Sequence, residues 1–203
     1  MCIRDRSGGV VPDAFMILSR IIASFHNDKG ELLIEGLTPT EQDVFELSDE
    51  FVKSSLSSNG VELFEMDSYS KRLWLEPALS ILAIDAPPVA ESVNLLIPKA
   101  KAKVSLRLPP TEDPDHAMNM LEKHIKENTP FNANVEFIPE AKGKGILVDP
   151  KNEFSSKLIE SFNKNWENKV AYMGVGGSIP FANVFINEFP NSEIVLVGAG
   201  DEE

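Results

Sequence analysis

Cysteine and histidine are scarce in this chain of 203 residues, which contains one cysteine, Cys2, and three histidines, His26, His116 and His124. A single cysteine cannot form a disulfide within the chain, and this favours a reducing compartment. We therefore expect a cytoplasmic protein. No acidic residue recurs around the histidines at the spacing of metal ligands. We expect all three to be solvated or partly packed, and no metal site.

Basic residues are also few, with 19 Lys and Arg against 32 Asp and Glu, for a formal net charge of −13. This charge opposes binding to nucleic acid or to anionic membranes, because both attract basic surfaces. No apolar run approaches the ~20 residues of a membrane-spanning helix. Apolar content of 42% and charged content of 25% are typical of a soluble globular protein. We expect neither nucleic acid nor a membrane as a partner.

The first half of the chain predicts helices and strands in succession. Pro12 and Asp13 suit the first turn of a helix whose apolar face carries Leu18, Ile21 and Phe25. The stretch 27–76 is polar and irregular, with one helix expected to start near Thr40. Residues 79–84 predict a buried strand.

The next segments predict a strand, a helix and a strand. Apolar and polar residues alternate strictly over 101–108, as in a strand with one buried face. Asp113 and Pro114 predict the start of a helix, and 134–138 predict a further strand. The fold class is therefore α/β (α+β): a ferredoxin-like βαββαβ unit whose first strand would come before residue 7.

The last third of the chain predicts a separate α-β-α-β segment. A Lys- and Gly-containing stretch at 140–145 is typical of a linker. Asp149 and Pro150 predict a helix start, and Phe154, Leu158, Phe162 and Trp166 follow at helical spacing. Two strands, 169–173 and 193–197, would flank a helix after Ser178. Such a segment buries little apolar surface by itself.

Residues 171–181 read AYMGVGGSIPF and end where that helix would begin. Two glycines allow the backbone to approach a ligand closely, and Ser178 with Pro180 can cap and start a helix. The free N–H groups of such a start favour a carboxylate or phosphate. Gly-Gly-Ser is also common in ordinary loops, so both interpretations stay open.

Three segments together resemble the zinc-dependent exopeptidase and amidohydrolase family of carnosinase-like dipeptidases, aminoacylase and succinyl-diaminopimelate desuccinylase. They are GGSIP at 176–180, SGGVVPDAFMIL at 7–18, and NLLIP at 94–98 with the following strand up to Pro109. They occur in the family's order. The resemblance implies a dimerisation (lid) domain at 7–140 and the last portion of the catalytic domain at 141–203. Residues 1–6 match nothing in the family, and we expect them to be non-native.

The resemblance implies hydrolysis of an amide bond at a pair of zinc ions, in dipeptides or small peptides with a free C-terminal carboxylate. It places most metal ligands and the catalytic glutamate before the lid, and the last histidine ligand after the glycine that matches Gly200. This chain would then supply homodimerisation and substrate recognition without any catalytic residue. We expect the chain alone to be inactive.

The resemblance also implies substrate-binding residues: Arg107, Asn94, Gly176, Gly177, Ser178 and Ile179. A guanidinium can pair bidentately with a substrate carboxylate, although periodicity alone favours a solvent-facing Arg107. Asn94 can donate to a carbonyl oxygen or stabilise a turn. Two alternatives stay open: a deacylase of N-acyl amino acids with the same metal chemistry, and a non-catalytic ferredoxin-like dimerisation module.

Overall fold

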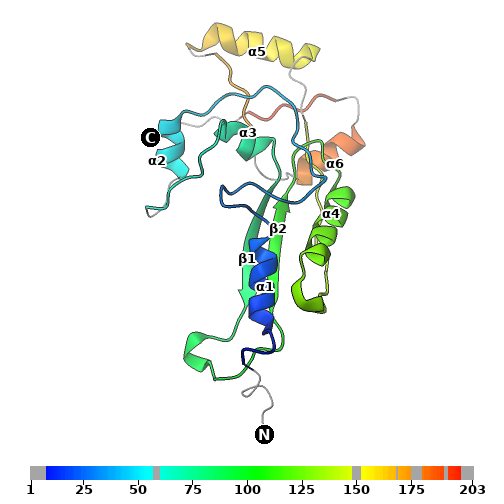
Figure 1. Ribbon diagram of the computed structural model, residues 1–203. Helices are drawn as coiled ribbons and strands as arrows, with labels where there is room; N and C mark the ends of the chain where they lie inside the picture. The colour runs from blue at the N-terminus through cyan, green and yellow to red at the C-terminus, as the bar shows by residue number, and fades with distance from the viewer. Residues whose placement is uncertain are drawn as a thin grey trace.

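The computed structural model describes residues 8–56, 60–147, 152–167, 169–174, 180–189 and 192–197. These residues form an α+β fold, as predicted, with helices α1 to α6, two short 3-10 helices and a two-stranded sheet (Figure 1). In chain order the elements are α1 (Ala14–Ala23), α2 (Asp49–Leu56), α3 (Tyr69–Trp74), β1 (Ala78–Asp85), η2 (Val89–Glu91), β2 (Lys101–Arg107), α4 (Pro114–Glu127), η3 (Pro130–Asn132), α5 (Glu153–Asn165) and α6 (Pro180–Glu188).

Strands β1 and β2 pair antiparallel, with Ala78 opposite Arg107 at one end and Asp85 opposite Lys101 at the other. The register shifts between Ile81 and Ala83. The connection between the strands contains η2 and lies beyond the lower end of the hairpin in Figure 1. Arg107 therefore lies at the end of the hairpin opposite to this connection.

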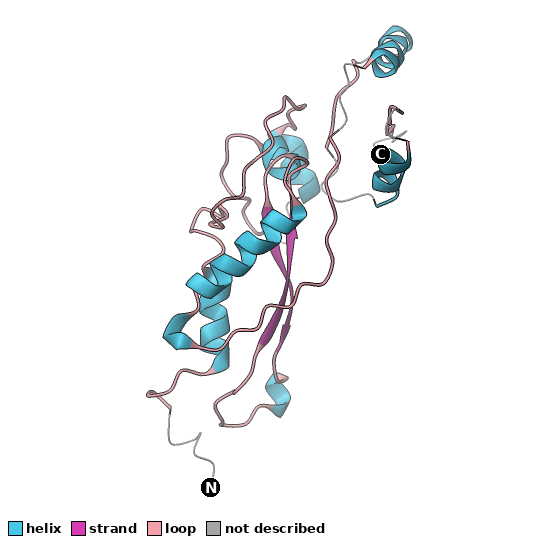
Figure 2. Ribbon diagram, turned by 90° about the vertical axis from the view of Figure 1, so that its right-hand side faces the viewer, coloured by secondary structure: helices cyan, strands magenta, loops and turns pink. Residues whose placement is uncertain are grey.

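Helices α1 and α4 pack against the hairpin and form the core with it (Figures 1 and 2). The buried cluster consists of Ile21, Phe25, Ile34, Leu79, Leu121 and Ile125. Burying an aliphatic or aromatic side chain of this kind contributes about 1.5–3 kcal/mol. The predicted alternation in β2 is confirmed, because Ala102, Val104 and Leu106 are half-buried while Lys101, Lys103 and Ser105 are exposed.

Aspartates cap both core helices. The carboxylate of Asp113 accepts hydrogen bonds from the backbone N–H groups of Asp115 and His116, each at 2.9 Å, and Pro114 follows it as predicted. The carboxylate of Asp13 accepts from the Met16 N–H at 2.9 Å. Asp13 is thus the N-cap of α1, which begins at Ala14. The prediction that Pro12 belongs to the first helical turn is wrong, because Pro12 precedes the N-cap.

The stretch 27–76 contains two helices where one was predicted. The helix expected near Thr40 begins only at Asp49, because the Thr40 N–H donates to the Leu75 carbonyl at 2.8 Å, and the Ser48 hydroxyl caps α2 by accepting from the Phe51 N–H. Helix α3 was not predicted. Its cap is Ser68, whose hydroxyl accepts from the Lys71 N–H at 3.1 Å.

Strand β1 forms where it was predicted, but the prediction that it is buried is wrong for most of its length. Leu79 lies in the core, whereas Leu82 is 58% exposed and Ile84 is 47% exposed. The core cluster covers only the first part of the strand, and β1 has β2 as its one neighbour among the described residues. The apolar side chains beyond Ile81 therefore face solvent.

The strands predicted at 134–138, 169–173 and 193–197 are absent from the described sheet, so these three predictions are wrong. Residues 133–137 do alternate as expected, with Val135 and Phe137 packed on the core and Asn134 and Glu136 exposed. Alternation alone does not make a strand, because a strand also needs ladder hydrogen bonds. Segment 134–138 makes no such backbone bond among the described residues.

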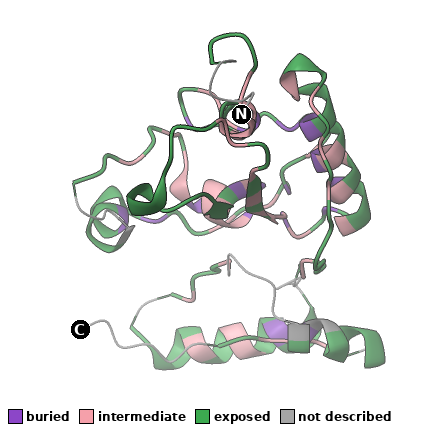
Figure 3. Ribbon diagram, turned by 90° about the horizontal axis from the view of Figure 1, so that it is seen from below, coloured by how far each residue is buried: buried purple, intermediate pink, exposed green. Residues whose placement is uncertain are grey.

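Helices α5 and α6 lie apart from the core helices and the hairpin (Figures 2 and 3). A residue far along the chain caps the N-terminus of α5. The Glu193 carboxylate accepts hydrogen bonds from the Ser155 N–H at 2.9 Å and from the Ser155 hydroxyl at 3.0 Å. The cap predicted at Asp149 lies outside the described residues. No helix of the described part is sufficiently long and apolar to span a membrane.

Candidate substrate-recognition site

Arg107 is the last residue of β2 and is half-buried, unlike the exposed Lys103 and Ser105 on the same face of the strand. Its Nη2 donates to the backbone carbonyl of Arg72 at 3.1 Å. This is the guanidinium's one hydrogen bond within the described part of the chain. An arginine side chain carries five N–H donors, so most of those of Arg107 remain available to an anion.

Helix α3 brings Arg72 to this end of the hairpin. The helix is short, and the buried Leu75 anchors its C-terminal end. The Arg72 side chain is held at two points: Nη1 pairs with the Glu76 carboxylate at 2.9 Å, and Nη2 donates to the Gly30 carbonyl at 2.5 Å. The two guanidinium-bearing residues thus meet at the junction of α3 and β2.

The charges at this junction favour an anion. Burial, and then the positive charge of Arg72, lower the pKa of Arg107 below its usual range, although an arginine stays protonated at neutral pH. The same two causes, in the same order, lower the pKa of His26. Glu76 pairs with Arg72, so the positive charge of Arg107 is left without a carboxylate partner among the described residues. A carboxylate is a suitable ligand for such a group.

The segment that precedes the Gly-Gly-Ser loop lies against α3. A Cβ atom on Gly174 would be 2.4 Å from both Cβ and Cγ of Trp74, so only glycine allows this approach. The Tyr172 carbonyl also accepts from the Phe45 N–H at 3.3 Å. The predicted loop residues Gly176, Gly177, Ser178 and Ile179 lie outside the described residues, and the structure describes their chain only up to Gly174.

Asn94 belongs to the connection between β1 and β2, and this connection leaves the end of the hairpin opposite to Arg107 (Figure 1). Strand β2 runs from Lys101 to Arg107, and at ~3.4 Å per residue it separates the two ends by about 20 Å. One copy of the chain therefore does not bring Asn94 and Arg107 to the same site.

Two of the three histidines, His116 and His124, have side-chain partners. His116 Nδ1 lies 2.7 Å from Glu112 Oε1, and Glu112 Oε2 also accepts from the Thr38 N–H. His124 is buried, with Nε2 3.1 Å from Ser24 Oγ. Within the described ranges no group of three or more His, Cys, Asp and Glu side chains could hold a metal ion. The described part of the chain therefore does not fit a metal site.

Arg72 is the residue of this site that the sequence interpretation missed. The available signals were Ser68 as a helix cap and the spacing of four residues between Arg72 and Glu76, which is typical of an ion pair on one helix face. Neither signal indicates that the Arg72 carbonyl meets Arg107. That contact depends on how α3 packs.

A family model described as a peptidase dimerisation domain, of the M20 peptidases, matches residues 5–133. The chain belongs to this family. The predicted family is therefore confirmed. A cysteinylglycine-S-conjugate dipeptidase of Corynebacterium striatum is 28% identical over 204 aligned positions, which cover 96% of this chain and 44% of that protein. The Cys-Gly metallodipeptidase DUG1 of Saccharomyces cerevisiae is 25% identical, with the same coverage of 96% and 44%. The chain thus spans less than half the length of these relatives.

Solved structures share the fold. The dipeptidase Dug1p of Saccharomyces cerevisiae superposes with a TM-score of 0.72 at 22% identity, over 94% of this chain and 43% of that chain. The M20 family metallo-carboxypeptidase Sso-CP2 of Sulfolobus solfataricus gives a TM-score of 0.68 at 20% identity, over 90% and 50% of the respective chains. Two of these relatives, DUG1 and Sso-CP2, are described as metallopeptidases, and all of them are longer than this chain.

Proposed function

We propose that this chain is part of a metal-dependent peptidase that cleaves dipeptides or small peptides with a free C-terminal carboxylate, and that it supplies dimerisation and substrate recognition. One observation carries the proposal. The two relatives that align with 96% of this chain are both dipeptidases, one of cysteinylglycine S-conjugates and one of Cys-Gly, and the matching family model describes a peptidase dimerisation domain.

We propose a lid domain at 7–140 and a portion of the catalytic domain at 141–203. The core cluster and the side chains packed against it, which all come from residues before 138, support this division. The described part of segment 141–203 contributes no residue to that cluster and exposes large apolar side chains. They include Phe154 (57% exposed), Trp166 (63%), Phe181 (69%) and Phe189 (55%). Exposed apolar side chains of this kind support a face that another part of the protein covers.

We assign to Arg107 the recognition of the substrate carboxylate, because its unpaired donors and its positive charge suit that group. Asn94 and the loop residues Gly176, Gly177, Ser178 and Ile179 keep their roles from the family resemblance alone. Because Asn94 lies at the other end of the hairpin, it can share a substrate with Arg107 only if the two come from different subunits of a homodimer.

We propose a pair of zinc ions as the cofactor, with ligands that belong to the remainder of a longer protein. Zinc would polarise the scissile carbonyl and activate a water molecule. The relatives described as metallodipeptidase and metallo-carboxypeptidase support a metal. We also propose a cytoplasmic location, because the chain has a single cysteine and this favours a reducing compartment.

The test is an assay of the complete protein from which this chain comes. We expect it to be a dimer that hydrolyses Cys-Gly, to lose activity with a chelator and to regain it with zinc, while the 203-residue chain alone is inactive. Preference for an N-acetyl amino acid over Cys-Gly would replace the dipeptidase by the deacylase. A folded, metal-free dimer without either activity would indicate the non-catalytic dimerisation module.

A further inference from the structure

We propose that Arg72 is a positioning residue for Arg107: it holds the end of α3 so that the Arg107 guanidinium presents its free donors to the substrate carboxylate. Arg72 thereby sets the preference for substrates with a free C-terminus. This inference rests on the proposed function, since it assumes that Arg107 binds the carboxylate.

The first step concerns the freedom of Arg107. Its side chain is long and leaves the strand at its last residue, where no further ladder bond follows. A free arginine side chain loses rotamer entropy when it is ordered. Within the described residues, the bond from Nη2 to the Arg72 carbonyl is what orders the guanidinium before substrate arrives. The position of that carbonyl therefore decides where the remaining donors lie.

The second step concerns what holds the Arg72 carbonyl. Helix α3 has six residues, fewer than a helix needs for stability by itself. The buried Leu75 and the bond from the Thr40 N–H to the Leu75 carbonyl hold its C-terminal end, and the Arg72 side chain adds a tie to the Gly30 carbonyl in the turn at 27–31. Within the turn, the Gly30 N–H donates to the Asn27 carbonyl at 2.9 Å, and Asn27 Oδ1 accepts from the N–H groups of Lys29 and Glu31.

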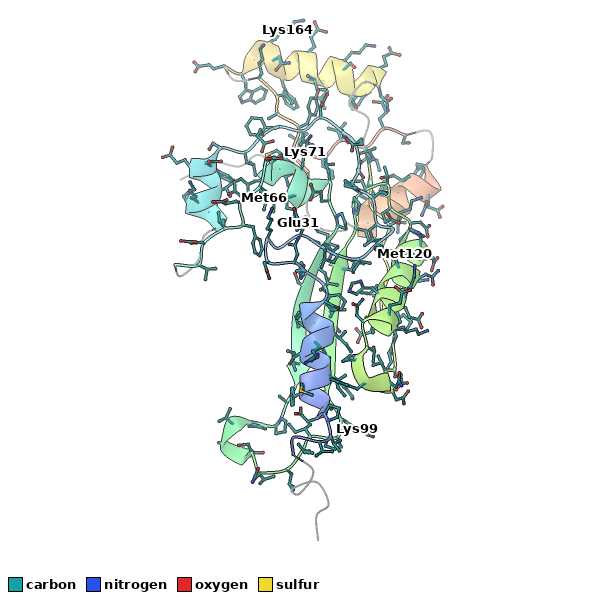
Figure 4. The ribbon with its side chains drawn as sticks, in the orientation of Figure 1. Glu31, Met66, Lys71, Lys99, Met120 and Lys164 are labelled. Atoms are coloured by element: carbon teal, nitrogen blue, oxygen red, sulfur yellow. The ribbon has the colours of Figure 1, made fainter. Side chains whose placement is uncertain are left out.

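The Arg72 guanidinium uses both of its ends in this arrangement, one on Gly30 and one on Glu76. A lysine at this position would keep the positive charge but could not hold both partners with one planar group. Substitution by lysine thus distinguishes the contribution of the positive charge of Arg72 from that of its two hydrogen-bonded contacts. Lys71 provides a matched control, because it is the preceding residue of the same helix, carries the same charge and is exposed (Figure 4).

The experiment measures binding to the complete protein by calorimetry. The probes are two reduced-amide analogues of Cys-Gly, which cannot be hydrolysed: one with a free C-terminal carboxylate and one with a C-terminal amide. The variants are Arg72→Gln, Arg72→Lys, Lys71→Gln and Arg107→Ala. The readout is the ratio of the two dissociation constants, which a general loss of folded protein does not change.

We expect Arg72→Gln to weaken binding of the free carboxylate about 5- to 10-fold and to leave the amide within about twofold. Arg72→Lys should show a smaller effect in the same direction, and Lys71→Gln none. In the Arg107→Ala background, Arg72→Gln should have no further effect, because Arg72 acts through Arg107. Should Arg72→Gln fail to fold, Glu76→Gln releases one end of the same guanidinium and should also lower the preference for the carboxylate.

Equal losses for both probes, no loss with Arg72→Gln, or additive losses with Arg107→Ala would each overturn the inference. The wild-type protein is assayed in parallel for Cys-Gly hydrolysis. If it hydrolyses nothing but binds the free carboxylate in an Arg72-dependent manner, the proposed function fails and the role of Arg72 stands. If the protein hydrolyses Cys-Gly but its preference for the carboxylate does not depend on Arg72, the proposed function stands and the role of Arg72 is refuted.

Discussion

Substituting Gly174 by alanine should detach the segment 169–174 from α3. The added methyl group would lie 2.4 Å from Cβ and Cγ of Trp74 and 3.0 Å from its Cδ1. Carbon atoms in contact normally lie ~3.5–4.0 Å apart, so one side must move by roughly 1 Å. Helix α3 is fixed by the buried Leu75 and by the bond from Thr40 to the Leu75 carbonyl. The segment is therefore the side that moves, at an overpacking cost of about 1–3 kcal/mol.

Hydrogen exchange of the Phe45 amide reports this detachment directly, because that N–H donates to the Tyr172 carbonyl. A cost of 1–3 kcal/mol corresponds to exchange that is about 5- to 150-fold faster in Gly174→Ala. Amides of α1 should be unchanged, since that helix belongs to the core. The control is Gly8→Ala, because no atom of the described residues lies within 4 Å of the added methyl group and Gly8 is not among the glycines with a positive φ.

This exchange measurement tests whether the segment 169–174 lies next to the proposed Arg107 site. If the Phe45 amide exchanges in Gly174→Ala as it does in the wild type and in Gly8→Ala, the segment does not pack on α3. The chain leading into the Gly-Gly-Ser loop would then be remote from Arg107, and the arrangement of the candidate site described above would be refuted.

Two further predictions concern stability. Phe25→Ala should lower the free energy of unfolding by about 3–5 kcal/mol in urea titrations, because the ring is 2% exposed, whereas Phe154→Ala, at 57% exposed, should change it by less than ~1 kcal/mol. Hydrogen bonds, first of all from the Ser155 N–H, hold the pKa of Glu193 below its usual range. The cap it provides is thus fully present above the unfolded pKa of about 4.3 and is lost as pH falls through the lower folded pKa. Amide exchange at the start of α5 should therefore accelerate in acid beyond the intrinsic pH effect, and Glu193→Ala should remove this dependence; an unchanged profile would contradict it.

Features that depend on neighbouring residues were predictable from the sequence. The Asp113 cap needs only the two N–H groups that follow it, and the alternation of β2 needs only one covered face. The start of α2 was misplaced because the Thr40 N–H is used by Leu75, a residue far along the chain. No local sequence pattern predicts that hydrogen bond.

Segment 134–138 shows the same limit for strands. Its alternation predicted which side chains pack on the core, Val135 and Phe137, and these do so. Whether an extended segment becomes a strand depends on a partner for its backbone, and this is not encoded in the segment itself. The alternation was informative about packing and uninformative about pairing.

The candidate site was predictable only in part. Arg107 could be named from the family resemblance, but the half-buried position of its side chain and its contact with Arg72 depend on the packing of a helix that had no strong signal. The distance between Asn94 and Arg107 follows from the hairpin register. Asn94 and Arg107 are close in sequence, and this proximity did not predict that the strand between them places them at opposite ends of the hairpin.

The central claim, that Arg107 holds the free carboxylate of a peptide substrate, is tested most directly by Arg107→Ala in the complete protein. The measurement is kcat/KM for Cys-Gly and for its C-terminal amide. Loss of a charge-assisted pair should cost about 1.5–3 kcal/mol, or roughly 10- to 150-fold, with the free dipeptide, and should leave the amide nearly unaffected. Equal losses for the two substrates, or no loss for either, would place Arg107 outside the substrate site.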